Sequence, residues 1–349
     1  MVLTFNQKFK GLTFVFLKLL PILSFIVAIS ILYNLDPTSF DYTWKGRTYY
    51  LFFVWAIILE TILSWDTLKA EDWKLKSLKT VLFTIALILP VLYVFLANYI
   101  SFNGYTNFNK FIINLAVKCK VGGPTIRDIE YFSGKMPLAI EYLVFTVIFE
   151  FIILTEYGID KLGKYKLSTL LLGLIGFVYL IDNLYPYGAF TPFQIIVPVT
   201  ASLAAFFLNL MGYRATLKIP ENGNVPILNV EGLKGPVGIG WQCSGVDSLT
   251  IYSIITLVFL KESSLSREKK IGYFVFGAII TYLINILRIV TIFMIGMTYG
   301  LGSKEWWRFH DYYGPLYSIT WITAYPLIII ATNTLGGKLK RMLRKRSDC

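Results

Sequence analysis

Long apolar runs constrain the fold of this chain more than any other feature. A membrane-spanning helix needs about 20 mainly apolar residues. Nine segments approach that length, namely 12–34, 48–65, 80–100, 137–155, 168–183, 193–211, 246–260, 271–298 and 314–335. Only 15% of the 349 residues are charged, against about 25% in soluble proteins. We therefore predict an all-α polytopic membrane protein and exclude a soluble or disordered chain.

Basic residues lie in short clusters beside these apolar runs, and they indicate the topology. The net charge is +12, and lysine and arginine accumulate on the cytoplasmic side of membrane proteins. The basic segments 66–79, 261–270 and 336–349, together with Lys8 and Lys10, therefore belong inside. Segments 213–245 and 299–313 then lie outside. This pattern explains the positive charge without a nucleic-acid partner.

Nine crossings cannot leave both chain ends inside. Either one of the nine segments does not cross, or 101–136 contains a further crossing. We predict about eight transmembrane helices, with a segment within 168–211 that does not cross.

Four regions follow from this pattern. They are an N-terminal multi-span membrane region (1–212), an extracellular loop (213–245), C-terminal helices (246–335) and a basic cytoplasmic tail (336–349). In the loop, short β-prone stretches flank Glu221-Asn222-Gly223-Asn224. The sequence therefore predicts a small extracellular β-hairpin.

The cysteine and histidine content excludes common metal and disulfide frameworks. The three cysteines, Cys119, Cys243 and Cys349, form no CxxC pair, and there is a single histidine. We predict no metal site and no cofactor.

Cys243 lies in the sequence Trp241-Gln242-Cys243-Ser244-Gly245, directly before the span that begins at Val246. A helix N-terminus favours a thiolate through its unpaired N–H groups and its dipole. Ser244 is suited to cap this helix, and Gly245 lets a substrate backbone come close. The alternative is that Cys243 is a small residue packed at a helix start.

Two further polar residues lie in or beside the last two spans. Arg288 lies ten residues from the outer end of span 271–298, about 15 Å along a helix, and shares a helix face with Asn285. Intramembrane arginines generally face polar cavities, although pairing with a glutamate in another span is the alternative, with candidates Glu60, Glu141 and Glu150. His310, the single histidine, precedes the last span on the same side as Cys243. Its neighbours Arg308 and Asp311 read as ordinary loop charges.

Together these residues form a set suited to acyl transfer. Cysteine supplies a nucleophile, histidine transfers protons, and arginine stabilises an oxyanion. We predict that Cys243, Arg288 and His310 lie within roughly 10 Å of one another, since resting active sites are often looser than hydrogen-bond reach.

The ordered residues resemble the exosortase/archaeosortase family of polytopic membrane cysteine transpeptidases. The resemblance rests on Cys243-Ser244-Gly245 opening a span, Asn285-x-x-Arg288 inside the next span, and His310 before the last span. It covers about residues 213–335, whereas the first 200 residues match only as a hydrophobic multi-span region. An archaeal-type member is preferred.

The resemblance implies roles for these residues. Cys243 attacks a peptide bond and becomes the acyl-enzyme, Arg288 steadies the oxyanion or orients the substrate, and His310 acts as general acid or base. Some archaeal members have arginine at the third position, which keeps Arg308 as a reserve candidate. Ser244, Gly245, Asn285 and Arg308 are expected to bind substrate.

The resemblance also implies the partners. The substrates are secreted proteins that end in a short motif, a transmembrane helix and a basic cluster. The enzyme removes this tail and passes the new C-terminus to a membrane lipid or another acceptor. The active site then faces the outside of the cell membrane.

Two other readings remain open from the sequence. A transporter or flippase would use Arg288 and the intramembrane glutamates, with Cys243 incidental. A purely hydrolytic enzyme would hand its acyl group to water.

Overall fold

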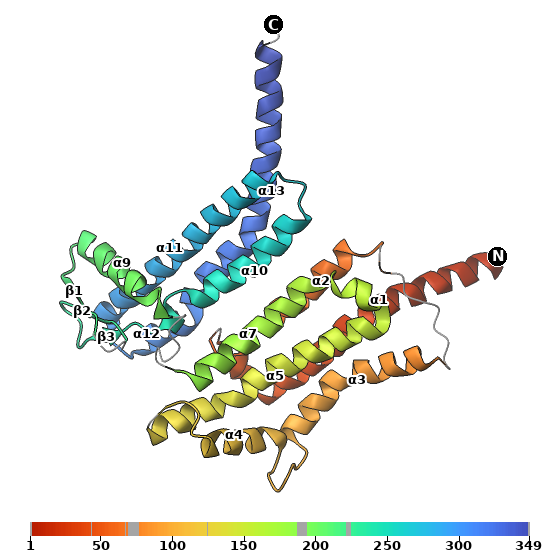
Figure 1. Ribbon diagram of the computed structural model, residues 1–349, viewed down its shortest axis with the longest axis horizontal. Coiled ribbons are helices and arrows are strands. Elements are labelled where there is room, and N and C mark those ends of the chain that lie inside the picture. Colours follow the sequence, from red (N-terminus) through yellow and green to blue (C-terminus); the bar gives the residue numbers. More distant parts are fainter. Residues whose placement is uncertain are drawn as a thin grey trace. The chain divides into compact units, whose positions relative to one another are not determined.

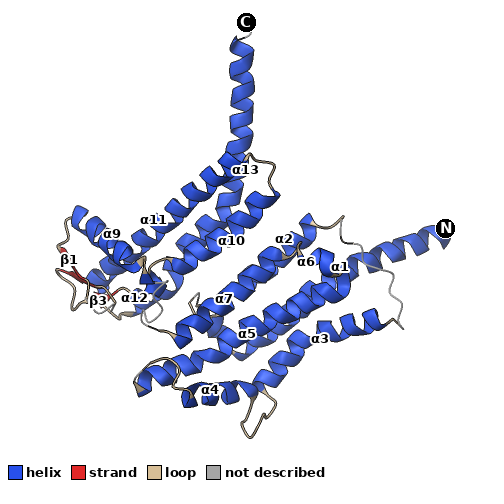
Figure 2. Cartoon of the chain, in the orientation of Figure 1, coloured by secondary structure: helices blue, strands red, loops and turns tan. Residues whose placement is uncertain are grey.

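The computed structural model describes residues 2–347 except 43, 67, 69–76, 124, 187–193 and 221–224. Helices dominate the described chain, with one small sheet (Figures 1 and 2). The chain forms two compact units, Met1–Pro186 and Tyr187–Cys349. The two units are described separately.

The first unit is a helical bundle organised around α5. Its helices are α1 (Val2–Leu35), η1 (Pro37–Phe40), α2 (Tyr49–Leu63), α3 (Leu78–Asn98), α4 (Phe108–Lys118), α5 (Ile126–Tyr157), α6 (Ile159–Leu162) and α7 (Lys166–Leu184). Helix α5 contacts α1, α3, α4, α6 and α7. Phe25 of α1 packs edge-to-face on Phe53, Phe145 and Phe149. Aromatic packing therefore joins α1, α2 and α5 in the core.

Two buried ion pairs lie in this unit. Lys45 Nζ lies 2.5 Å from Asp182 Oδ2 and donates to Asn183 Oδ1 at 2.7 Å. Arg47 donates to both oxygens of Glu141, at 2.7 and 2.9 Å. These pairs fix the α1–α2 connection against α5 and the last turn of α7.

The other two intramembrane glutamates also have partners within the first unit. Glu60 of α2 accepts hydrogen bonds from the backbone N–H groups of Leu167 and Ser168, at 2.6 and 3.1 Å, and so caps the start of α7. Glu150 accepts from the Thr169 hydroxyl at 2.6 Å. All three glutamates considered as partners of Arg288 are therefore occupied elsewhere.

The second unit combines three long helices with the sheet. Its elements are α9 (Val197–Leu210), β1 (Ala215–Lys218), β2 (Ile227–Val230), β3 (Val237–Gly238), η2 (Trp241–Cys243), α10 (Val246–Glu262), α11 (Arg267–Tyr299), α12 (Lys304–Arg308), η3 (Phe309–Tyr313) and α13 (Gly314–Ser347). Helices α10, α11 and α13 contact one another pairwise. Helix α9 contacts α11 and β1, so it lies with the second unit, although the sequence-based boundary at residue 212 groups it with the N-terminal spans.

The sheet is antiparallel, with strand order β1-β2-β3. Ala215 pairs with Val230 and Lys218 with Ile227, while Ile227 pairs with Gly238. Strands β1 and β2 are the predicted hairpin, and β3 extends it. The predicted turn 221–224 lies outside the described residues.

Six helices of the described chain are long and apolar enough to cross a membrane. They include most of α1 and α13, and the whole of α3, α5, α7 and α11. The apolar segment 193–211 forms α9, which has only 14 residues. That length corresponds to about 21 Å, shorter than a hydrocarbon core of about 30 Å. The predicted polytopic all-α architecture is confirmed.

Candidate active site

Cys243 ends a short 3₁₀ turn that opens onto α10. Its N–H donates to the Gly240 carbonyl at 3.0 Å, and the Ser244 N–H donates to the Trp241 carbonyl at 3.0 Å. The buried Ser244 hydroxyl also donates to the Trp241 carbonyl, at 2.6 Å. Ser244 therefore ties the turn together and does not cap α10, whose N-cap is Gly245.

Gly245 is needed for a close approach by Asn285 of α11. Its φ of +89° is a conformation that favours glycine. A Cβ there would lie 2.9 Å from Asn285 Nδ2, and this amide donates to the Cys243 carbonyl at 3.0 Å. The space over Gly245 is thus filled by Asn285, where we expected a substrate backbone. Both residues hold the cysteine turn in place.

His310 lies beside the cysteine. Its Nε2 is 3.7 Å from Cys243 Sγ, and its Nδ1 is 2.6 Å from Asp311 Oδ1. The Trp306 ring stacks on the imidazole with centroids 5.1 Å apart. A thiol, an imidazole and a carboxylate therefore form a connected triad. Sequence reasoning missed Asp311, and the only signal for it was an acidic residue beside the single histidine.

A π-helical turn carries both His310 and Asp311. In a regular α-helix the Gly314 N–H would donate to the His310 carbonyl, but in η3 it donates to the Phe309 carbonyl. Arg288 Nη2 donates to the His310 carbonyl instead, at 3.0 Å. Isolated π-turns frequently occur at functional sites, and this one links the arginine to the histidine backbone.

Gly314 makes room for that arginine. A Cβ on Gly314 would lie 2.8 Å from Arg288 Nε and 3.0 Å from its Cγ. The buried guanidinium is 7% exposed, and among the described residues its Nε has no hydrogen-bond partner. Arg288 therefore keeps one buried donor free near the thiol and histidine.

The surroundings of Cys243 favour its thiolate. Burial by itself raises the pKa of the Cys243 thiol. The hydrogen bond with His310, the charge of His310 and the charge of Arg288 act in the opposite direction and outweigh burial. The pKa of Cys243 is consequently lower than that of an ordinary thiol, as a nucleophile requires.

Arg308, the reserve candidate, takes a different place. It is exposed, and its guanidinium lies 5.3 Å from the centre of the Tyr313 ring. His310 is the residue that the fold brings to Cys243. Among the described residues, no group of three or more His, Cys, Asp or Glu side chains is placed so that it could hold a metal ion.

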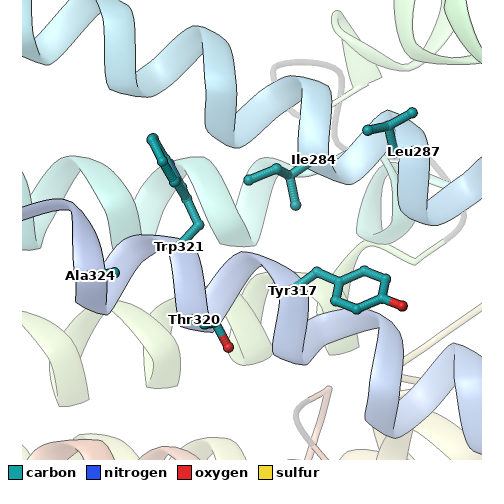
Figure 3. Close-up of a pocket in the computed structure, with 6 residues that line it drawn as sticks. All are labelled: Ile284, Leu287, Tyr317, Thr320, Trp321 and Ala324. Carbon is teal, nitrogen blue, oxygen red and sulfur yellow. The ribbon is translucent and has the colours of Figure 1, made fainter. Parts of the chain in front are cut away.

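An apolar groove lies between α11 and α13, apart from the catalytic side chains (Figure 3). It has a volume of about 500 Å³ and is lined by Ile284, Leu287, Tyr317, Thr320, Trp321 and Ala324. Ile284 and Leu287 precede Asn285 and Arg288 by one position, so they lie on a neighbouring face of the same helix. The residues that line the groove include no carboxylate, amine, guanidinium or imidazole.

Comparison with known proteins assigns the chain to a family. A family model described as "Transmembrane exosortase" matches residues 44–327, more than half of the chain. Neither curated proteins nor solved structures gave a significant match. The match covers Cys243, Arg288 and His310 as well as most of the helices, and the family comprises membrane-embedded sorting transpeptidases. This chain is therefore a multi-pass membrane protein that belongs to the transmembrane exosortase family.

Proposed function

We propose that this protein is a membrane cysteine transpeptidase that removes the C-terminal sorting signal of secreted surface proteins. The observation that supports this proposal most directly is the triad. Cys243 Sγ lies 3.7 Å from His310 Nε2, and His310 Nδ1 lies 2.6 Å from Asp311 Oδ1. Thiol, imidazole and carboxylate in this order are the parts of a nucleophilic acyl-transfer enzyme.

In the first step the Cys243 thiolate attacks the carbonyl carbon of the scissile peptide bond. His310 Nε2 takes the thiol proton, and Asp311 holds the Nδ1–H and stabilises the imidazolium. The tetrahedral intermediate then collapses, the C–N bond breaks, and His310 returns the proton to the leaving amine. The tail departs and a thioester remains on Cys243.

We assign to Arg288 the role of stabilising the oxyanion of the tetrahedral intermediate. The N–H groups of Cys243 and Ser244 already donate to carbonyls of their own turn. Backbone donors at these two residues are therefore committed, whereas the buried Arg288 Nε is free. A charged donor in a site that excludes water stabilises the developing oxyanion strongly.

In the second step an acceptor attacks the thioester. His310 removes the proton from an acceptor amine or hydroxyl, the new bond forms at the acyl carbon, and Cys243 leaves as the thiolate. A lipid headgroup of the membrane is the proposed acceptor, and transfer to water would make the enzyme a hydrolase.

The distribution of basic residues supports an active site at the outer surface. The end of α10 carries Lys261, the first turn of α11 carries Arg267, Lys269 and Lys270, and the C-terminal tail is basic. These segments therefore belong to the cytoplasmic side. Cys243 precedes α10 at the opposite end, and it meets substrates that emerge from the membrane on the outside.

The test compares cells that make wild type, Cys243→Ala or Cys243→Ser, with Cys119→Ala as the matched control. Mass spectrometry of secreted proteins identifies any protein whose C-terminal tail persists only in the Cys243 variants. We expect tail removal in wild type and Cys119→Ala and its loss in both Cys243 variants at equal enzyme levels.

The mass of the processed C-terminus then identifies the acceptor. A lipid or amine adduct supports transpeptidation, and a free carboxylate indicates hydrolysis. Processing that is unchanged in Cys243→Ala would refute the thiol mechanism and favour the transporter reading.

A further inference from the structure

The strand that leads to Cys243 presents an open edge. Strand β3 pairs with β2 so that Leu228 faces Val237 and Ile227 faces Gly238, and the Ile239 N–H donates to the Pro226 carbonyl at 2.8 Å. Hydrogen-bonded and non-hydrogen-bonded pairs alternate along an antiparallel ladder. Residues 237 and 239 therefore bond to β2, and the N–H and C=O of Gly238 point away from it.

At the opposite edge of the sheet, formed by β1, the backbone groups that point away from β2 are capped. The Glu231 N–H donates to the Arg214 carbonyl, so by alternation the backbone groups of Ala215 point away from β2. Asn209 of α9 satisfies both of them. Its Nδ2 donates to the Ala215 carbonyl at 3.1 Å, and its Oδ1 accepts from the Ala215 N–H at 2.9 Å.

Among the described residues, no such cap covers Gly238. Neither of its backbone groups has a hydrogen-bond partner within this part of the chain, and the residue is exposed. Gly240, which follows at the same side of the strand, is also without a side chain. The described residues therefore cap the far edge and leave the edge near the nucleophile accessible.

The open edge of β3 leads directly into the turn Trp241–Cys243. Gly240 is still extended, with φ −76° and ψ 165°, and its carbonyl accepts the hydrogen bond from the Cys243 N–H. Five positions separate Gly238 from Cys243. A peptide lying along β3 is thus guided toward the thiol.

We propose that the substrate segment flanking the scissile bond binds in extended form as a fourth strand on β3, through the N–H and C=O of Gly238. This inference rests on the proposed function and specifies how that site holds its peptide. Strand addition supplies affinity through main-chain hydrogen bonds, so one edge accepts segments of differing sequence.

The first test uses Gly238→Pro, with Gly238→Ala as its matched control. Proline removes the outward N–H and leaves the bonds of residues 237 and 239 to β2 intact, as edge strands tolerate. The probe is the protein whose tail persists in Cys243→Ala cells. For Gly238→Pro we expect KM to rise about three- to tenfold, the effect of one lost hydrogen bond. Both kcat and the rate at which iodoacetamide alkylates Cys243 should stay unchanged. In Gly238→Ala the new Cβ lies 3.2 Å from Val225 Cγ1, which requires only a small shift of that side chain, so this variant should keep the wild-type KM.

The outcomes separate this inference from the proposed function. If no protein keeps its tail in Cys243→Ala cells, the proposed function fails and the inference fails with it. If Gly238→Pro processes the substrate with the wild-type KM, the added strand is refuted while the function stands. If Gly238→Pro lowers the alkylation of Cys243 as well as the processing of the substrate, β3 acts by supporting the cysteine turn. That outcome also refutes the inference.

A second test does not depend on activity. In a background with all three native cysteines changed to alanine, Pro236→Cys places a thiol on the exposed part of this edge, and Thr216→Cys on β1 is the control. Single cysteines are placed at successive positions around the cleavage site of the substrate, and disulfides are formed by mild oxidation. An added strand gives cross-links to Pro236→Cys that alternate with period two and none to Thr216→Cys. An absence of cross-links, or equal cross-linking at every position, would contradict it.

Discussion

The carboxylate of Asp311 decides which nitrogen of His310 carries the proton. With Oδ1 only 2.6 Å from Nδ1, the neutral imidazole keeps its hydrogen on Nδ1 and leaves Nε2 free to accept the thiol proton. For Asp311→Asn we expect kcat to fall on the order of 10²-fold, the lower end of general acid–base effects, with KM nearly unchanged. Glu305→Gln, an exposed acidic neighbour in α12, is the control and should keep the wild-type kcat. An equal loss in both variants would argue against a specific role for Asp311.

The lowered pKa of Cys243 predicts the pH dependence of its reactivity. Only the thiolate reacts with iodoacetamide, so the alkylation rate falls as the pH falls through the thiol pKa. Because the pKa of Cys243 lies below that of an ordinary thiol, about 8.5, this fall should occur at a lower pH than for a free cysteine peptide. Removing the imidazole in His310→Ala should move it to higher pH. Peptide mass spectrometry distinguishes Cys243 from the exposed Cys119, and an unshifted profile in His310→Ala would contradict the pairing.

At the scale of single residues, the sequence points out candidate residues more readily than it predicts which residues they contact. Cys243, Arg288 and His310 stand out because a thiol at a helix start, an intramembrane arginine and a lone histidine are costly or rare. Asp311 and Gly314 do not stand out, since loop aspartates and glycines are common and their roles depend on the geometry of neighbouring elements. The sequence suggests that Ser244 and Gly245 contact substrate, whereas in the structure Ser244 bonds to Trp241 and Thr200 and the space over Gly245 is filled by Asn285.

Among the elements, the π-turn connects the last helix to the active site. For Gly314→Ala, the added Cβ meets Arg288 Nε at 2.8 Å and the Phe309 carbonyl oxygen at 2.9 Å, so the guanidinium has to leave the His310 carbonyl. We expect kcat to fall at least about tenfold, with a loss of about 1–3 kcal/mol in the free energy of unfolding.

Gly272→Ala is the matched control for that variant. Gly272 lies in α11 with open space where its Cβ would be, and alanine favours a helix over glycine. Its kcat should equal wild type and its thermal midpoint should be equal or higher. A Gly314→Ala enzyme with the wild-type kcat would show that the arginine is not held by the π-turn.

Element boundaries were predictable where apolar periodicity is long, and less so where tertiary contacts decide. The hairpin of β1 and β2 follows from β-prone stretches around a turn, but β3 has only two residues and is defined by its pairing with β2. In the π-turn Arg288 takes the place of the helical donor to the His310 carbonyl. This contact comes from another helix, so no local pattern of residues 309–313 reveals it.

For the whole molecule, the three cysteines test the topology. In the topology predicted from the sequence, with eight crossings and α9 not crossing, both chain ends lie inside, Cys119 and Cys243 lie outside, and Cys349 lies inside. A charged, membrane-impermeant thiosulfonate reagent should therefore label Cys119 and Cys243 in intact cells and reach Cys349 only after permeabilisation. Labelling of Cys349 in intact cells would require an odd number of crossings.

The two compact units predict that stability and chemistry respond separately to mutation. Lys45→Met leaves Asp182 buried without its 2.5 Å partner, which typically costs about 3–5 kcal/mol. We expect a lower thermal midpoint by intrinsic fluorescence, partly restored in Lys45→Met/Asp182→Asn. The alkylation rate of Cys243 well below the transition should match wild type, because the catalytic residues belong to the other unit. A parallel loss of Cys243 reactivity would mean that the units are energetically coupled.

His310, the proposed proton carrier, is also the single histidine of the chain. Labelling with ¹⁵N-histidine would thus give one imidazole spectrum that needs no assignment, provided that the affinity tag contains no histidine. The two nitrogen shifts would report directly which ring atom holds the proton, before and after Cys243 is acylated. Every change in this spectrum would therefore belong to His310, the residue proposed to move the proton.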